Sequence, residues 1–135
     1  MEANQDLILR ETDFQRISSM IGGATEEVQE FLQTELDRAK VVPDDQLPVD
    51  VVAMNTTVTF LDLATNKTNQ VTLVYPFDAN IAENKISVLA PVGAALIGLR
   101  VGQTIKWPLP GGKEKELKVV NVTREDEKVS QSVTS

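Results

Sequence analysis

The side chains that could perform chemistry in this chain are mainly carboxylates, because the sequence contains no histidine and no cysteine. Their absence excludes disulfides, thiol nucleophiles, zinc sites built from cysteine and histidine, and every catalytic triad in which histidine is the base. Two adjacent acid pairs stand out, Glu26–Glu27 and Asp44–Asp45. Asp44 and Asp45 have the chemistry for general acid–base catalysis. They precede a proline-containing linker with no partner base, so we interpret them as a solvated hinge.

Two further features have both a functional and a structural interpretation. The PGGK motif at 110–113 suggests a phosphate loop, but it lacks the GxxxxGK[ST] spacing and no helix follows it, which favours a tight hairpin turn. Trp107 and Tyr75 are candidates for lining a ligand pocket. Aromatic residues make up only 4% of the chain. Trp107 alternates in phase with Ile105 and Leu109, which favours a core position for Trp107.

A first helix is predicted to begin near Thr12. Thr12 followed three residues later by Gln15 has the form of a capping box. One helical face is apolar, and two glycines at 22–23 end the helix; that face contains Phe14, Ile17 and Ile21. The segment before it is either a short strand at Leu7–Leu9 or an extended segment laid on the domain.

A second helix of about 16 residues, roughly 24 Å long, is expected to follow. Thr25 is its predicted N-cap, and the acids Glu26 and Glu27 lie in its first turn, where negative charge offsets the helix dipole. Pro43 is expected to end it. Its apolar stripe contains Val28, Phe31, Leu32, Leu36 and Ala39. Because the connecting loop is short, the two helices should form an antiparallel hairpin within residues 1–46.

The rest of the chain predicts an antiparallel sheet with one short helix, so the fold class is α+β. Extended patterns predict strands near 51–54, 56–62, 70–75, 86–89, 104–109 and 115–122. A helical turn at 92–99 is broken by glycines at 98 and 102. Residues 47–124 are expected to form this domain, and 125–135 a disordered tail, because that segment is charged and then rich in serine.

Several separate motifs resemble the C-terminal domain of the bacterial Gre transcript-cleavage factors. They are APVGAALIG at 90–98, VG at 101–102 and PGGK at 110–113. Two upstream motifs, TELDRA at 34–39 and DVVAMN at 50–55, resemble a short subgroup of that family, the regulators of nucleoside diphosphate kinase. The resemblance covers most of the chain and implies an FKBP-like fold for the C-terminal domain.

The resemblance implies that Leu89, Ala90 and Pro91 bind RNA polymerase. In the family, the matching serine–proline turn, with an acid just before it, helps to dock the domain at the rim of the polymerase secondary channel. Pro91 keeps the proline of the family, whereas Ala90 and Leu89 replace the serine and the acid. The alternative is that Leu89 and Pro91 close a strand end and fill the core, and both interpretations stay open at this point.

The resemblance also suggests a role for the tip of the hairpin. In Gre factors, acidic residues at the tip of a much longer hairpin help to hold a metal ion at the polymerase active centre. The hairpin here is too short for that delivery, and Glu26 and Glu27 project about 100° apart on a helix. We therefore expect no metal, no cofactor and no catalytic residue, and interpret both acids as stabilising the helix.

The charge and composition of the chain limit the kinds of molecule that it can bind. The formal net charge of −7 argues against binding a nucleic-acid backbone over a broad surface. No apolar run is long enough to span a membrane, and a secretory signal is lacking, so a cytoplasmic location is expected. We expect a monomeric transcription regulator that binds RNA polymerase and competes with Gre factors without stimulating cleavage. The alternatives are a regulator of nucleoside diphosphate kinase or another protein, and a peptidyl-prolyl isomerase.

Overall fold

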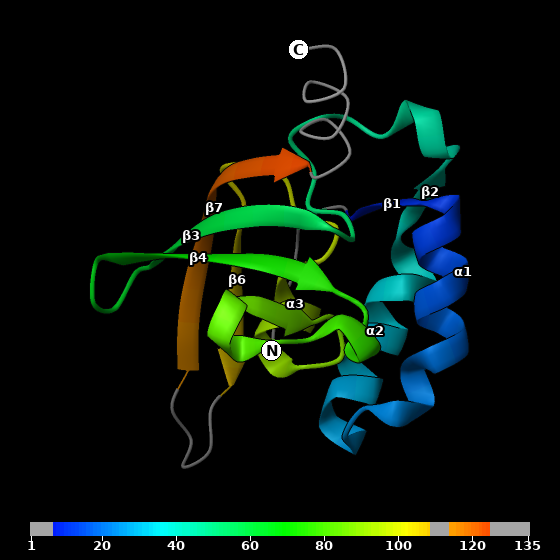
Figure 1. Ribbon diagram of the computed structural model, residues 1–135, viewed down its shortest axis with the longest axis horizontal. Coiled ribbons are helices and arrows are strands. Elements are labelled where there is room, and N and C mark those ends of the chain that lie inside the picture. The colour runs from blue at the N-terminus through cyan, green and yellow to red at the C-terminus, as the bar shows by residue number, and fades with distance from the viewer. Residues whose placement is uncertain (1–6, 109–113, 125–135) are drawn as a thin grey trace.

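The computed structural model describes residues 7–108 and 114–124. It contains a pair of helices packed side by side, a short two-stranded ribbon, and a five-stranded sheet with one short helix (Figure 1). The predicted α+β class and the helical hairpin are therefore confirmed. The turn predicted at 110–113, the tail at 125–135 and the side chain of Trp107 lie outside the described part of the protein.

The helical hairpin consists of α1 (Glu11–Met20) and α2 (Glu26–Arg38), joined through a 3₁₀ turn at Ile21–Gly23. The side chain of Thr25 caps α2 as predicted, because its hydroxyl accepts a hydrogen bond from the N–H of Val28 at 3.4 Å. α2 has 13 residues, so it spans about 20 Å and is shorter than expected. None of the helices in the described ranges is long and apolar enough to cross a membrane.

A parallel ribbon closes the open end of the hairpin. β1 (Ile8–Arg10) pairs with β2 (Lys40–Val42). Of the two alternatives for the segment before α1, a strand or an extended segment laid on the domain, the structure therefore shows the strand. The prediction that α2 continues to Pro43 is wrong. Ala39 is already extended, and the valines that follow it join the ribbon, where β-branched side chains pack well.

The capping box predicted at Thr12 is also wrong. α1 begins at Glu11 with Arg10 as its N-cap residue, and the Arg10 side chain does not cap the helix. Thr12 lies inside the first turn, where its main-chain N–H and its hydroxyl both donate to the carboxylate of Asp44. An unpaired N–H at a helix start can be satisfied by any nearby acceptor, and here the linker after the hairpin provides it.

The sheet has the strand order β5-β4-β3-β7-β6. Its strands are β3 (Thr56–Asp62), β4 (Lys67–Val74), β5 (Lys85–Ser87), β6 (Thr104–Pro108) and β7 (Glu114–Arg124). All neighbours are antiparallel except β4 and β5, which are parallel. The prediction of a wholly antiparallel sheet is therefore corrected at this edge. The chain between β4 and β5 includes two 3₁₀ turns, which allow it to return and run in the same direction.

The strand predicted at 51–54 does not form. Val51 makes one isolated bridge with Arg100, and the N–H of Val52 donates to the carbonyl of Leu99 at 2.8 Å. The whole segment is buried. A short, unbroken apolar run is compatible with any buried segment, so the pattern did not distinguish a strand from a buried loop.

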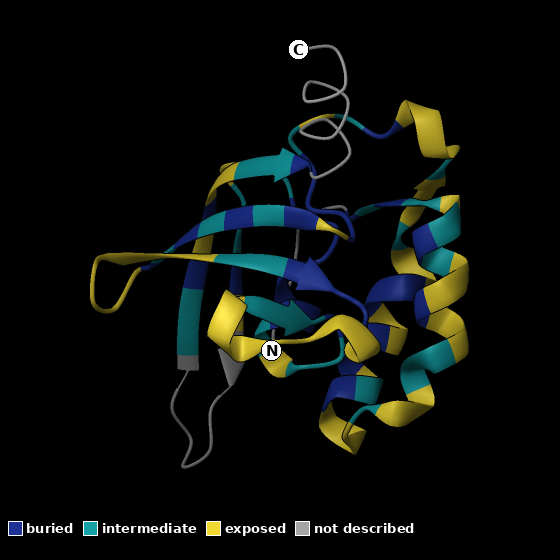
Figure 2. Cartoon of the chain, viewed as in Figure 1, coloured by how far each residue is buried: buried dark blue, intermediate teal, exposed yellow. Residues whose placement is uncertain are grey.

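One apolar core joins the hairpin to the sheet. The short helix α3 (Pro91–Leu96) contacts β5, β6 and α2, and Figure 2 shows buried residues where the hairpin and the sheet face each other. Side chains from both parts belong to this core and are fully buried; they include Ile17, Leu32, Leu73, Leu96 and Ile105. Along β3, buried and partly exposed residues alternate, as expected for a strand with one face on a core.

Candidate functional site at the hairpin tip and the Pro91 turn

The turn between β5 and α3, residues 88–91, is held in one conformation; we call it the Pro91 turn. The hydroxyl of Ser87 accepts a hydrogen bond from the N–H of Leu89 at 3.0 Å, and the Ser87 carbonyl accepts one from Ala90 at 3.0 Å. Ala90 is extended, as the residue before a proline prefers. Pro91 is the first residue of α3, where its missing N–H costs nothing.

The three residues predicted to bind a partner differ in exposure. Pro91 is exposed, whereas Leu89 and Ala90 are half-buried. Leu89 packs against the edge of the apolar core. The proline thus faces solvent, whereas the leucine contributes to packing.

Gly93 allows α3 to approach the Pro91 turn closely. A Cβ atom built on Gly93 would lie only 2.1 Å from the carbonyl oxygen of Ser87. No side chain fits in that space, so glycine is required at this position of the helix. The close approach fixes the start of α3 against the end of β5 and gives the turn a rigid support.

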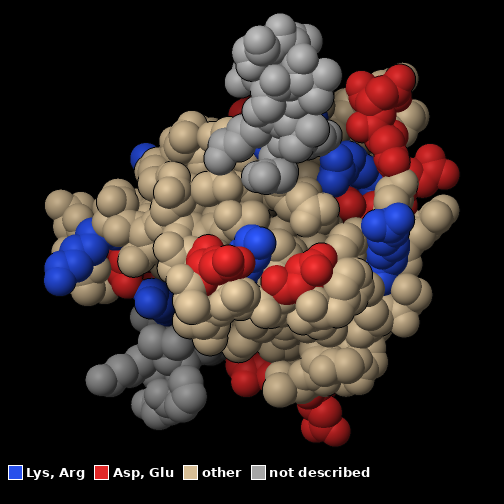
Figure 3. Space-filling view, viewed as in Figure 1, with Lys and Arg blue, Asp and Glu red and all other residues tan. Residues whose placement is uncertain are grey.

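The hairpin tip, residues 21–27, is held by hydrogen bonds from a side chain of α2. The side-chain amide of Gln29 donates to the carbonyl of Ala24 at 2.7 Å and to that of Gly22 at 3.3 Å. Glu26 and Glu27 are exposed in the first turn of α2. In Figure 3 an acidic side chain projects at the end of the molecule where the tip lies. The tip is therefore an ordered, acidic projection.

The structure brings the Pro91 turn and the hairpin tip together. A Cβ atom built on Gly23 would lie 3.6 Å from Cδ1 of Leu89, which is ordinary van der Waals contact. α2 and α3 also contact each other directly. The two segments, which are far apart in the sequence, thus lie next to each other in the fold.

The described residues include no group of three acidic, cysteine or histidine side chains that could hold a metal ion. Glu26 and Glu27 lie next to each other without a third carboxylate in that arrangement. Asp44 is exposed, and its hydrogen bonds from Thr12 lower its pKa. Asp44 therefore has a structural role at the start of α1 and lacks the raised pKa of a general acid.

A buried polar cluster, which the sequence did not predict, joins α1 to the sheet. Asp13 is 2% exposed. Its carboxylate accepts hydrogen bonds from Arg10 at 3.0 and 3.3 Å, from the N–H of Met54 at 3.2 Å and from the hydroxyl of Tyr75 at 3.2 Å. We call these four residues the Asp13 cluster. Asp13 lies four residues before Ile17 on the apolar face of α1, and an acid at such a position was the available signal.

Tyr75 belongs to this cluster through the hydrogen bond that its hydroxyl donates to Asp13. Its side chain is buried, and burial, together with the nearby Asp13 carboxylate, raises the pKa of Tyr75 to about 12. Its ring stacks on Phe77 with centroids 6.0 Å apart, and the Arg16 guanidinium lies 5.8 Å from its centroid. The Tyr75 hydroxyl is therefore neutral at physiological pH and serves as a hydrogen-bond donor.

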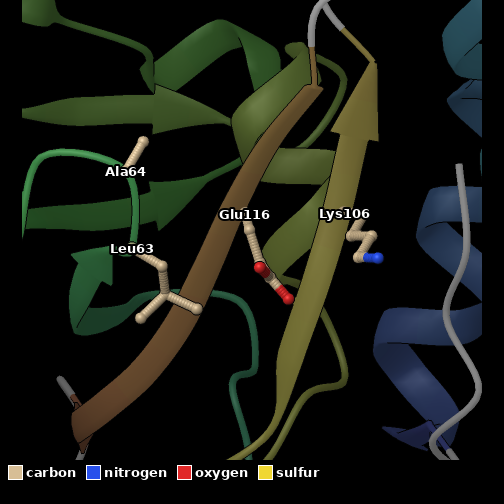
Figure 4. Close-up of a pocket in the computed structure, with 4 residues that line it drawn as sticks. All are labelled: Leu63, Ala64, Lys106 and Glu116. Carbon is tan, nitrogen blue, oxygen red and sulfur yellow. The ribbon is translucent and has the colours of Figure 1, made fainter.

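A shallow hollow of about 310 Å³ lies at the other end of the sheet, lined by Leu63, Ala64, Lys106 and Glu116 (Figure 4). Lys106 on β6 and Glu116 on β7 are register partners, but in Figure 4 the ammonium group of Lys106 is directed away from Glu116. None of these lining residues is aromatic.

The chain is similar in sequence to a known protein family and to named bacterial proteins. Residues 47–124 match the family described as "Transcription elongation factor, GreA/GreB, C-term". A protein of Escherichia coli strain K12 named "Regulator of nucleoside diphosphate kinase" is 39% identical over 124 residues, which cover 90% of this chain and 91% of that protein. The similarity extends across the hairpin as well as the sheet.

Two further relatives are informative. "Transcription elongation factor GreA" of Syntrophus aciditrophicus is 38% identical over 96 residues, covering 66% of this chain but only 60% of that protein. The solved structure titled "Prokaryotic transcription elongation factor GreA/GreB from Nitrosomonas europaea" superimposes with a TM-score of 0.72 at 38% identity, covering 89% of this chain and 99% of that one.

Proposed function

The chain belongs to the GreA/GreB family of transcription elongation factors, and on that basis we propose that it is a transcription regulator that binds RNA polymerase. The family resemblance inferred from separate sequence motifs is confirmed. In this proposal the protein is a cytoplasmic monomer, takes no cofactor and is not an enzyme. Its C-terminal domain, FKBP-like as the resemblance implies, docks at the rim of the polymerase secondary channel.

The Pro91 turn is the proposed docking site. The support for this is its geometry: Pro91 is exposed at the start of α3, while Ser87 and the close approach of Gly93 hold the turn rigid. A small, rigid, apolar turn can serve as a hot spot when it enters a groove on its partner. Since Leu89 and Ala90 replace the acid and serine of the family, shape and apolar contact contribute more to this docking than charge.

The observation that carries the proposal is the contact between the Pro91 turn and the hairpin tip. Because Leu89 packs beside Gly23, docking through the turn places the tip at the same edge of the polymerase. The hairpin then occupies space that a Gre factor needs. Its second helix has only 13 residues, and its tip acids form no metal site, so we propose that it blocks Gre factors without stimulating transcript cleavage.

A competition experiment tests this function. The fluorescently labelled protein is titrated with purified bacterial core RNA polymerase, and unlabelled GreA is then added. We expect saturable binding and displacement by GreA. Absence of binding, or binding that GreA does not displace, contradicts the proposal.

The cleavage part is tested separately with backtracked elongation complexes. GreA serves as the positive control, and we expect the protein to add no cleavage above the intrinsic rate and to inhibit cleavage by GreA. The Glu26→Ala/Glu27→Ala variant should behave like the wild type in the absence of GreA. Metal-dependent cleavage that this variant loses would show that the tip does deliver a metal ion.

A second candidate function follows from the name of one relative. The Escherichia coli protein that is 39% identical is called a regulator of nucleoside diphosphate kinase, so the alternative is that this chain acts on such a kinase or another protein partner. Purified nucleoside diphosphate kinase, assayed with and without the protein, distinguishes the two. A direct change in kinase activity at stoichiometric protein favours the alternative.

A further inference from the structure

The Asp13 cluster spans the junction between the hairpin and the sheet domain. Asp13 comes from α1, Met54 from the segment before β3, and Tyr75 from the end of β4. One carboxylate therefore joins three segments that are far apart in the sequence. In Figure 1, α1 stands at the end of the sheet toward which β4 points, so the end of β4 faces the hairpin.

The side chains of Arg10 and Asp13 together bind both main-chain polar groups of Met54, its N–H and its carbonyl. The Met54 N–H donates to Oδ2 of Asp13 at 3.2 Å, and the Met54 carbonyl accepts from Nη2 of Arg10 at 3.2 Å. Met54 is 1% exposed, so water cannot replace these partners without opening the junction. Arg10 also pairs with Asp13 directly, which makes the arrangement a closed ring of hydrogen bonds.

The apolar contacts at this junction have no comparable directionality. Ile17 and Leu32 of the hairpin share one core with Met54 and Tyr75, but hydrophobic attraction is non-directional and tolerates several rotations of one surface on another. Hydrogen bonds require both distance and angle. In some proteins a buried polar group selects one packing among several of similar apolar area.

From this geometry we propose that Asp13 is a positioning residue that fixes the angle of the hairpin on the sheet domain and so keeps the hairpin tip beside the Pro91 turn. The link to docking rests on the proposed RNA polymerase binding. Asp13 touches neither the tip nor the turn in the described contacts; it acts through the orientation of α1, to which α2 is packed.

The first measurement needs no polymerase. The chain contains no cysteine, so spin labels can be placed at Glu30→Cys on α2 and Asn69→Cys on β4, both exposed positions. Pulsed electron–electron double resonance should give one narrow distribution of the distance between the two labels in this background. Asp13→Asn, which keeps the size of the side chain but removes its charge, should give a broad distribution or a second distance. Tyr75→Phe removes one donor and should broaden it less.

Glu11→Gln is the matched control, because Glu11 is an exposed acid in the same helix and its substitution should leave the distribution narrow. A folded Asp13→Asn variant with the narrow wild-type distribution overturns the proposal. If Asp13→Asn does not fold, an unchanged distribution in Tyr75→Phe overturns it, and a broadened one supports it.

The second measurement is the affinity of the unlabelled Asp13→Asn variant for core RNA polymerase, expected to fall about fivefold because ordering the hairpin then becomes part of binding. The Glu11→Gln control should bind like the wild type. A broadened distribution with unchanged affinity overturns the link between hairpin angle and docking. If the wild type itself does not bind polymerase, the proposed function fails, while the distance measurement still decides the role of Asp13.

Discussion

Asp44 accepts a hydrogen bond from the main-chain N–H of Thr12 at 3.0 Å and a second one from the Thr12 hydroxyl, although 32 positions separate the two residues. A carboxylate from the linker thus satisfies the start of α1. The cap predicted within the helix is provided from outside it, and the linker and the hairpin stabilise each other.

Asp44→Ala should lower the melting temperature, because Thr12 and the first turn of α1 lose their acceptor. Asp44→Asn is the matched control, since asparagine also caps helices well. Thermal melts followed by circular dichroism at neutral pH test this. An alanine variant as stable as the asparagine variant would show that the contact contributes nothing.

The same contact predicts a pH dependence. The hydrogen bonds from Thr12 lower the pKa of Asp44 below its ordinary value of 3.8, so at acid pH the unfolded chain binds more protons than the folded one. The stabilisation is therefore complete above pH 3.8 and is lost as the pH falls through the lower pKa of the folded state. The difference in melting temperature between wild type and Asp44→Ala should shrink over that range, and a constant difference contradicts the assignment.

Gly93→Ala should destabilise the protein strongly. The added methyl group would overlap the Ser87 carbonyl at 2.1 Å, and relieving such overlap costs about 1–3 kcal/mol or more. Gly22→Ala is the control, because a Cβ there meets nothing within 4 Å. Urea denaturation of both variants measures the effect. Equal stability of the two variants would mean that α3 moves freely away from β5.

Arg124 is the last residue that the structure describes. Its side chain is 9% exposed and donates to the carbonyls of Leu47 and Pro48. Truncation after Thr123 should therefore cost about 2 kcal/mol more than truncation after Arg124, since hydrogen bonds from a buried charged group are among the stronger ones. Chemical denaturation of the two truncated proteins compares them, and an indistinguishable pair would show that the Arg124 contacts are not stabilising.

The Pro91→Ser/Leu89→Asp double variant should weaken RNA polymerase binding at least about tenfold, or about 1.4 kcal/mol. Because Leu89 also packs on the core edge, Pro91→Ser alone is the cleaner probe of docking, as Pro91 is exposed. Circular dichroism checks the fold of each variant. Wild-type affinity in a folded double variant removes the docking assignment, and a loss of fold would instead assign the turn to the core.

The sequence by itself determined features that depend on neighbouring residues. Thr25 caps α2 because a hydroxyl and the N–H groups that need it lie within one turn. β3 follows the predicted strand because alternation places one face on the core. Gly98 and Gly102 interrupt the helical conformation as predicted. Their φ values are 83° and 94°, which glycine adopts at no steric cost.

Only the tertiary structure decided which distant groups meet. The sequence shows Asp13 as one acid in a helix, and the folded chain makes it the buried partner of Tyr75. The parallel pairing of β5 and the contact of Leu89 with Gly23 likewise depend on how the chain returns after β4. Such pairs are selected by the packing of the whole core and by the need to satisfy buried polar groups, and neither requirement leaves a local pattern in the sequence.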